Sequence, residues 1–320
     1  MKVPFVLPIL AAMTLGTSAT LLAADPLQAL NDEFETDSLT DWSRVKDAEM
    51  WPNEQLEVLD IDVTRDGWMT MVPYTNGWYE DYRGPLVFKE VTGDFVVTTR
   101  VQATNRAGTG APERSYSLAG LMIRAPRAIT PATWTAGGEK YSFLSIGSAN
   151  TPGTFQYEVK STSNEDELPE YSRLDISASD CSCGDTLLQT ARLGQYVIQL
   201  AKTATGDWRI VNRYRRPDLP AVLQVGFVTY TDWPNVEITP VETHNTTTLT
   251  EVLGQPGVPT QPDLRAQFEY IRFLTPEVPP VFAGLDLANA AEVSDAELLS
   301  FLGENAVSAF ASVGDFWMAF

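Results

Sequence analysis

The segment 78–83, Trp-Tyr-Glu-Asp-Tyr-Arg, places three aromatic rings and three charges within six residues of a turn-rich stretch. Flat aromatic faces stack on the C–H surfaces of sugar rings, and carboxylates hydrogen-bond sugar hydroxyls. Trp78, Tyr79, Asp81 and Tyr82 are therefore candidate glycan-binding residues. The alternative interpretation is that Trp78 and Tyr82 alternate inward as core residues.

Arg124 and Tyr141, which lie further along the chain, complete the candidate site. Arg124 ends a predicted central strand. If it lies beside Tyr141, its side chain could reach into the concave face of the predicted sheet. In a chain with 42 acidic and 22 basic residues, an acidic neighbour could equally hold this arginine. Trp233, which follows Tyr-Thr-Asp at 230–232, is a further candidate at the rim of a sheet.

Nucleophilic and metal chemistry lack their usual residues in this chain. His244 is the only histidine, and no Gly-x-Ser-x-Gly motif is present to pair with it, so a surface position is the simpler interpretation. Cys181 and Cys183 are the only cysteines, and a zinc site would need two further ligands. We expect a local disulfide at a loop tip, no catalytic residue and no metal site.

Charge and the first residues restrict the compartment and the partners. The net charge of −20 repels phosphate backbones and anionic headgroups, which argues against nucleic acid and membrane partners. Residues 1–24 have a basic start, an uncharged run and small residues before Asp25, as secretory signals do. The expected location is secreted or periplasmic, without membrane insertion; the sequence does not predict an oligomeric state.

Period-two apolar patterns separated by turn residues recur from Asn31 to Leu274 without sustained helical periodicity. This pattern predicts an all-β, antiparallel two-sheet jelly-roll sandwich, because parallel sheets would need helical crossovers. Residues 163–185 are predicted to be an acidic loop, and residues 234–263 a Thr/Pro-rich insertion. The predicted strands are 56–63, 68–72, 86–89, 94–103, 117–124, 140–147, 154–161, 195–202, 207–213, 223–229 and 267–274.

The chain changes character after Pro276. Ser294-Asp295-Ala296-Glu297 has the spacing of a capping box, and it predicts a short amphipathic helix that ends near Gly303. The predicted organisation is a signal peptide (1–24), a jelly roll (25–275) and a C-terminal linker with a short helical tail (276–320). The apolar tail either docks on the β domain or contacts a partner, and docking is the more ordinary case.

An ordered set of segments resembles the concanavalin A-like (laminin-G-like) jelly-roll superfamily, and especially the β-sandwich modules appended to family-43 glycosidases. The resemblance spans most of 31–274 and implies a two-sheet jelly roll with one concave, often carbohydrate-associated face. It implies no reaction, because this superfamily includes lectins, enzymes and structural modules. The segments are Asp-Glu-Phe at 32–34, Leu-Thr-Asp-Trp at 39–42, Val-Thr-Gly-Asp-Phe at 91–95, Leu-Ala-Gly-Leu-Met-Ile-Arg at 118–124, Gly-Thr-Phe-Gln-Tyr at 153–157, Val-Ile-Gln-Leu at 197–200, Asp-Trp-Arg at 207–209, Gln-Val-Gly-Phe at 224–227 and Phe-Glu-Tyr-Ile-Arg-Phe at 268–273.

The enzymes of this superfamily would carry Glu-x-Asp-x-x-Glu or Glu-x-Asp-x-Glu on one strand face. The nearest stretch here is 57–62, in which Asp60 and Asp62 share a face while Glu57 points away. The match fails as a catalytic signature, and the two aspartates are interpreted as solvated residues or cation ligands. Calcium often accompanies such jelly rolls, and Asp32 and Glu33 are the candidate ligands, although no calcium-loop spacing is present.

These observations favour a secreted, non-catalytic protein that binds polysaccharide or a surface glycan. One alternative is a glycoside hydrolase or polysaccharide lyase that uses the same concave face. The other alternative is a structural or interaction module whose apolar tail contacts a partner.

Overall fold

The computed structural model describes residues 24–163, 172–179, 184–202 and 205–310. Residues 1–23 of the predicted signal peptide, both cysteines and residues 311–320 of the tail lie outside the described residues. Among the described residues, none of the helices has the length and apolar character needed to cross a bilayer.

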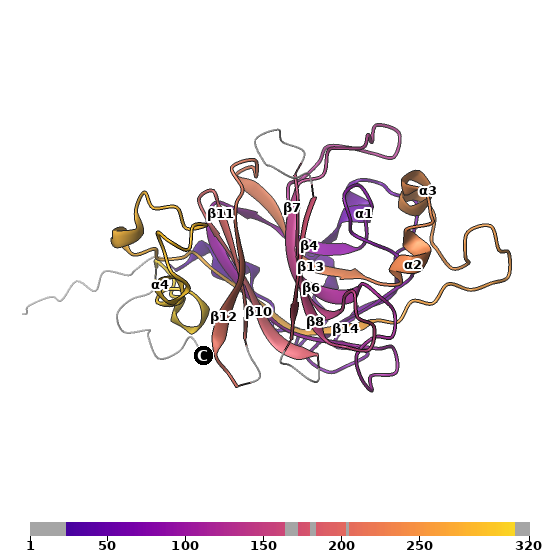
Figure 1. The fold of residues 1–320 in the computed structure, drawn as a ribbon, viewed down its shortest axis with the longest axis horizontal. Coiled ribbons are helices and arrows are strands. Elements are labelled where there is room, and N and C mark those ends of the chain that lie inside the picture. The colour runs from indigo at the N-terminus through magenta and orange to yellow at the C-terminus, as the bar shows by residue number, and fades with distance from the viewer. Residues whose placement is uncertain (1–23, 164–171, 180–183, 203–204, 311–320) are drawn as a thin grey trace, which may run out of the picture.

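Two antiparallel seven-stranded sheets pack face to face, which confirms the predicted jelly-roll sandwich (Figure 1). Sheet I has the strand order β1-β4-β13-β6-β7-β8-β9, and sheet II has the order β12-β11-β10-β5-β14-β3-β2. Sheet I consists of β1 (Ser43–Arg44), β4 (Leu86–Thr92), β13 (Val222–Tyr230), β6 (Ser117–Arg124), β7 (Tyr141–Ser148), β8 (Gln156–Thr162) and β9 (Ser172–Ala178). Sheet II consists of β12 (Trp208–Arg215), β11 (Tyr196–Lys202), β10 (Asp185–Leu193), β5 (Phe95–Thr104), β14 (Arg265–Leu274), β3 (Met69–Pro73) and β2 (Leu56–Ile61).

The main core fills the space between the sheets with alternate residues of each strand. On β6, Leu121 and Ile123 face this core, while Leu118 and Met122 belong to a second apolar cluster on the outer face of sheet I. Every residue of β6 is buried. The strand is covered on both faces, which explains why its sequence is an apolar run instead of an alternation.

The start and end of the sandwich lie side by side. Asp32 forms an antiparallel bridge with Ile271 of β14, and the Phe273 amide donates to the Asn31 side chain over 2.7 Å. Asp32 also accepts hydrogen bonds from Ser38 and from the Trp42 indole, and Glu33 pairs with Arg272. Both candidate calcium ligands therefore have protein partners.

The predicted acidic loop at 163–185 is partly wrong, because β9 occupies Ser172–Ala178 within it. The strands predicted from the sequence also do not include β10, at Asp185–Leu193. Polar residues alternate along β9, and at the sheet edge Asp175 accepts a hydrogen bond from Asn212 of β12 over 2.7 Å. This contact joins the edges of the two sheets and closes one side of the sandwich.

Short helices and loops form two outer layers, one on each sheet (Figure 1). The capping box is confirmed: Ser294 accepts from the Glu297 amide, and Glu297 accepts from the Ser294 amide. The C-terminal segment covers part of sheet II by placing Phe301 and Leu302 in one apolar cluster with Ile198 and Leu200. The helical elements are η1 (Pro26–Leu30), η2 (Leu39–Asp41), α1 (Val45–Ala48), α2 (Trp233–Val236), α3 (Val241–Thr246), η3 (Pro280–Phe282), α4 (Asp295–Leu299) and η4 (Gly303–Asn305).

Candidate glycan-binding face

The outer face of sheet I carries a polar row across four neighbouring strands. Glu90 on β4 lies opposite Gln224 on β13, which lies opposite Arg124 on β6, which lies opposite Tyr141 on β7. Cross-strand neighbours on one face are in contact distance. Register alone therefore brings Arg124 and Tyr141 together, as expected from the sequence.

Loops cover this face, and we call the segments 74–85, 105–116, 125–140 and 231–263 the roof. His244 and Asn245 of α3 hold the roof together: Gly77 donates its amide hydrogen to His244 Nε2 over 3.0 Å, and Asn245 Nδ2 donates to the Asp81 carbonyl over 2.8 Å. Asp81 in turn accepts from the Gly137 amide over 2.9 Å. The predicted insertion 234–263 is thus a packed part of the roof.

His244 is buried, so the expected surface position is wrong. Its Nε2 accepts a hydrogen bond, which requires the remaining proton to be on Nδ1, facing the Asn245 side-chain oxygen at 2.9 Å. Burial lowers the pKa of His244 to about 4, so the ring is neutral at pH 7. The ring is a structural acceptor within the roof.

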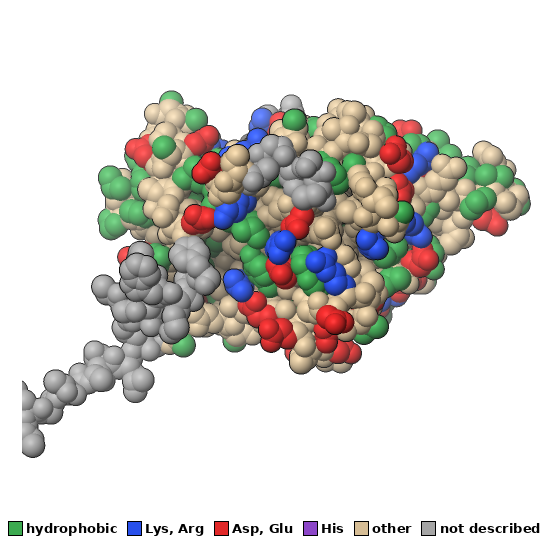
Figure 2. All heavy atoms as spheres, turned by 90° about the horizontal axis from the view of Figure 1, so that it is seen from below, with side chains coloured by type: hydrophobic (Ala, Val, Ile, Leu, Met, Phe, Trp, Pro, Cys, Tyr) green, Lys and Arg blue, Asp and Glu red, His purple; other side chains and the backbone are tan. Residues whose placement is uncertain are grey.

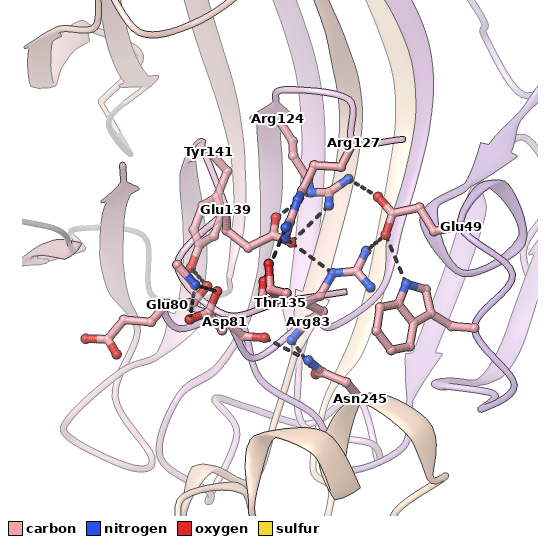
Figure 3. Close-up of polar contacts among 12 residues, drawn as sticks. Glu49, Glu80, Asp81, Arg83, Arg124, Arg127, Thr135, Glu139, Tyr141 and Asn245 are labelled. Carbon is pink, nitrogen blue, oxygen red and sulfur yellow. Dashed lines mark hydrogen bonds and ion pairs between the residues drawn. The ribbon is translucent and has the colours of Figure 1, made fainter. Parts of the chain in front are cut away.

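A buried ion network joins the roof to the strands (Figure 3). Arg124 Nε lies 2.8 Å from Glu139, and Arg83 Nε lies 3.1 Å from the same carboxylate. Glu49 pairs with Arg83 and, at 2.8 Å, with Arg124. Arg127 adds a third guanidinium 2.7 Å from Glu139.

Both carboxylates of this network are almost fully buried, at 0% exposure for Glu139 and 1% for Glu49. Burial alone would raise the pKa of Glu139, but Arg124 and Arg83 outweigh it and lower the pKa to about 2. Removing one partner of such a network leaves an uncompensated buried charge. Glu139 therefore fixes the loop 125–140 to Arg124 on sheet I.

The structure brings all six predicted site residues to this face, but at different depths. Trp78, Arg124 and Tyr141 are buried: the Trp78 and Tyr141 rings meet edge to face at 5.3 Å, and the Trp78 indole donates to the Pro85 carbonyl. Their side chains have protein partners and support the roof from below.

Tyr79 and Tyr82 lie higher in the roof and are partly exposed, as are Tyr116 and Trp233. Trp233 lies at the centre of the group, with the rings of Tyr79, Tyr82 and Tyr116 at 5.6, 5.7 and 6.1 Å from it. Burial raises the pKa of each of these tyrosines, so the phenols remain neutral donors. We call these four residues the aromatic rim.

A charged pair lies directly beneath the aromatic rim. Lys160 Nζ is 3.0 Å from Glu158, donates to the Trp78 carbonyl over 2.9 Å and lies 5.1 Å from the Tyr79 ring centre. Burial and Glu158 raise the pKa of Tyr230 well above its usual value. Tyr116, Lys160 and Glu158 are not among the residues predicted from the sequence, because nothing local in the sequence shows that they share a face with Trp233.

Asp60 and Asp62, which were considered above as catalytic residues or cation ligands, stabilise a turn instead. Asp60 accepts from the amide and hydroxyl of Thr64, and Asp62 accepts from the Gly67 amide. Asp62 lies beyond the end of β2 at φ 61°, so the two side chains do not share a strand face as predicted. The part of the chain that the structure describes contains no group of three or more His, Cys, Asp or Glu side chains able to hold a metal ion.

No protein-family model matches this sequence, and no curated protein matches it. Among solved structures, a functionally unknown protein from Saccharomyces cerevisiae is 14% identical at a TM-score of 0.47, over 75% of this chain and 99% of that one. The GH43 protein BlXynB from Bacillus licheniformis is 11% identical at a TM-score of 0.48, over 77% of this chain but only 39% of that one. The kappa-carrageenase from Pseudoalteromonas carrageenovora, in complex with an oligotetrasaccharide of kappa-carrageenan, is 10% identical at a TM-score of 0.44, over 82% and 98%. These similarities concern the type of fold.

Proposed function

We propose that this chain is a secreted, non-catalytic protein that binds polysaccharide through the aromatic rim. The observation that carries the proposal is the grouping of Tyr79, Tyr82, Tyr116 and Trp233, all partly exposed, on one side of a roof. Rings with one apolar face and a polar edge suit sugar rings, whose C–H faces are apolar and whose edges carry hydroxyls.

Rigidity of the roof supports this role. The loop of Tyr79 and Tyr82 is held by Asn245, His244 and the buried Arg83, so the rings do not have to be ordered when a glycan binds. A ligand site whose side chains are already ordered loses less entropy on binding. The partly exposed Asp81 carboxylate and the phenol oxygens can accept hydrogen bonds from sugar hydroxyls, while the Tyr82 hydroxyl itself donates to the Thr239 carbonyl over 3.0 Å.

Substitution of Trp233 by alanine tests the proposal. Affinity electrophoresis in gels with arabinoxylan, xyloglucan, galactomannan or κ-carrageenan should show retardation of the wild-type chain by at least one polymer. Loss of one stacking ring at the centre of the rim should weaken that binding about tenfold or more. The matched control is Tyr270→Ala, a half-buried tyrosine on β14 of sheet II, which should leave retardation unchanged. Equal effects of both variants, or no retardation by any polymer, would refute the proposal.

The second candidate function is a glycoside hydrolase or polysaccharide lyase that uses the same face. The observation in its favour is the Glu158–Lys160 pair beside Tyr230, which combines an acid, a base and a phenol. All three side chains are buried under the rim, at 0%, 4% and 1% exposure, which favours binding over catalysis in this arrangement. Incubation with the same polymers should release neither reducing ends nor unsaturated uronates. Release that is lost in Glu158→Gln would establish the enzyme instead.

A further inference from the structure

A surface hollow of about 510 Å³ lies near the start of β13, at the opposite end of this strand from the aromatic rim. Gln224 lines the hollow, whereas Tyr230 and Trp233 near the rim lie six and nine residues further along. At about 3.3 Å per strand residue, Gln224 and Tyr230 are about 20 Å apart. We call this hollow the β4 cleft; its volume falls in the range of small-molecule sites.

The β4 cleft exists because β1 is very short. Ser43 and Arg44 pair only with Phe88 and Val87, so the remainder of the β4 edge is not covered by a further strand. The segment before β1 then forms the opposite wall, with Leu30 of η1 and Asp41 of η2. Leu30, which is partly exposed, gives this lining an apolar side chain.

Gln224 is the feature that points to a ligand. Its side chain is 4% exposed, and its Oε1 accepts a hydrogen bond from Arg124 Nη1 over 2.8 Å. Nε2 then carries both amide hydrogens, and among the described residues it donates to no partner. Nε2 therefore retains solvent access on the side of the cleft, and it can donate to an acceptor bound there.

The other polar groups of the cleft are acceptors or are already paired. Asp41, Glu90 and the Ser43 hydroxyl line it and are exposed. Lys89 Nζ donates to the Leu30 carbonyl over 3.0 Å, lies 3.9 Å from Asp32 and is 4.7 Å from the Trp42 ring centre. The ammonium is therefore already surrounded by protein groups. The cleft thus presents one fixed amide donor, two carboxylates, the Ser43 hydroxyl and the apolar side chain of Leu30.

We propose that the β4 cleft is a second glycan site that takes a neutral, hydroxyl-rich sugar unit. A hydroxyl oxygen accepts from Gln224 Nε2, further hydroxyls donate to Asp41 and Glu90, and apolar C–H groups of the sugar pack on Leu30. An acidic sugar is disfavoured because its carboxylate would face two carboxylates without an available cation. The ligand class rests on the proposed glycan function, but the site and its residues are separate from the rim.

Isothermal titration calorimetry with defined oligosaccharides tests the proposal on the full folded chain. The probes are xylohexaose, cellohexaose and mannohexaose as neutral ligands and hexagalacturonate as the acidic ligand. The test variants are Asp41→Ala with Glu90→Ala, both exposed, and separately Trp233→Ala in the rim. The matched control for charge removal is Glu251→Ala with Glu237→Ala, two exposed acids outside the cleft.

We expect at least one neutral hexaose to bind Trp233→Ala, and we expect the added Asp41→Ala and Glu90→Ala changes to weaken that binding at least tenfold. The control pair should leave it unchanged, and hexagalacturonate should not bind the cleft. Gln224→Leu should produce a similar loss while circular dichroism shows a folded chain.

Three results would overturn the proposal: no neutral hexaose binding to Trp233→Ala, binding unaffected by the cleft substitutions, or a preference of the cleft for hexagalacturonate. If Trp233→Ala abolishes all binding, the cleft proposal fails and the rim proposal stands. If only the cleft substitutions weaken binding, the rim proposal fails and the cleft stands.

Discussion

The two outer faces of the sandwich are covered by different chemistry. On sheet II the C-terminal segment packs through apolar side chains such as Phe282, Phe301 and Leu302. On sheet I the roof is attached by buried ion pairs, with Glu139 bonded to Arg83 and Arg124. Apolar burial stabilises without specifying orientation, whereas a hydrogen-bonded ion network fixes the position of each loop. The cover of sheet II thus contributes apolar burial, whereas the roof on sheet I also fixes the positions of the loops that carry the proposed site.

The two outer faces also differ in how their charged side chains are paired. Away from the C-terminal segment, the outer face of sheet II carries exposed ion pairs such as Arg100 with Asp185 and Glu269. On the face shown in Figure 2, basic side chains likewise lie among acidic ones and do not form a separate patch. Exposed pairs of this kind contribute little to stability. The buried ion network of Glu49 and Glu139 lies under the roof, and Arg216 with Asp218 forms a further buried pair outside it.

The largest effect is expected for Glu139→Ala, which leaves Arg83, Arg124 and Arg127 facing one another in a buried site. We expect the free energy of unfolding in urea to fall by about 4 kcal/mol, together with loss of polysaccharide binding. The control is Glu304→Ala, which removes an exposed partner of Lys202 and should cost less than about 1 kcal/mol. Equal stability of the two variants would show that the network does not hold the roof.

Phe301→Ala tests the C-terminal segment that covers sheet II. Removal of this buried ring should lower the free energy of unfolding by about 3 kcal/mol, because it opens a cavity beside Phe282. Polysaccharide retardation in the same gels should remain at the wild-type level. Loss of binding in Phe301→Ala without loss of the fold would contradict the separation of the two faces.

Acidification should loosen the roof in two steps. His244 has a pKa of about 4 in the folded chain and 6.5 as its ordinary value, so only the unfolded chain takes up the proton as the pH falls between these values. The free energy of unfolding should fall by up to about 3 kcal/mol between pH 6.5 and 4. Glu139, with a pKa lowered to about 2 from 4.5, then contributes a further loss between pH 4.5 and 2. Urea denaturation at each pH measures both steps.

His244→Gln separates the two steps, since glutamine offers an acceptor without titrating. The variant should lose the dependence between pH 6.5 and 4 and keep the step below pH 4.5. If this variant keeps the fall in the free energy of unfolding between pH 6.5 and 4, another titrating group causes that fall.

Local patterns predicted the sandwich, and long-range contacts decided the site. The apolar run of β6 and the capping box at Ser294 are visible within a few residues, and both are confirmed. β9 was missed because its polar edge position resembles the acidic loop around it. Pairing of His244 with Gly77 joins residues 167 positions apart, and no local pattern encodes such a contact.

The candidate site shows the same limit. Residue types in 78–83 predicted a candidate site, but not that Trp78 faces inward while Tyr79 remains partly exposed. Alternation along a strand does not extend into an irregular loop such as 74–85, where backbone turns decide direction. Glu80 at φ 50° is one such turn.

Amide hydrogen–deuterium exchange with and without a bound polysaccharide tests the account most directly, because it reports on the roof and on the C-terminal segment in one experiment. We predict added protection in the segments that carry Tyr79, Tyr82, Tyr116 and Trp233, and unchanged exchange in residues 280–308 over sheet II. Protection confined to 280–308 or to the exposed strands of sheet II would contradict the account.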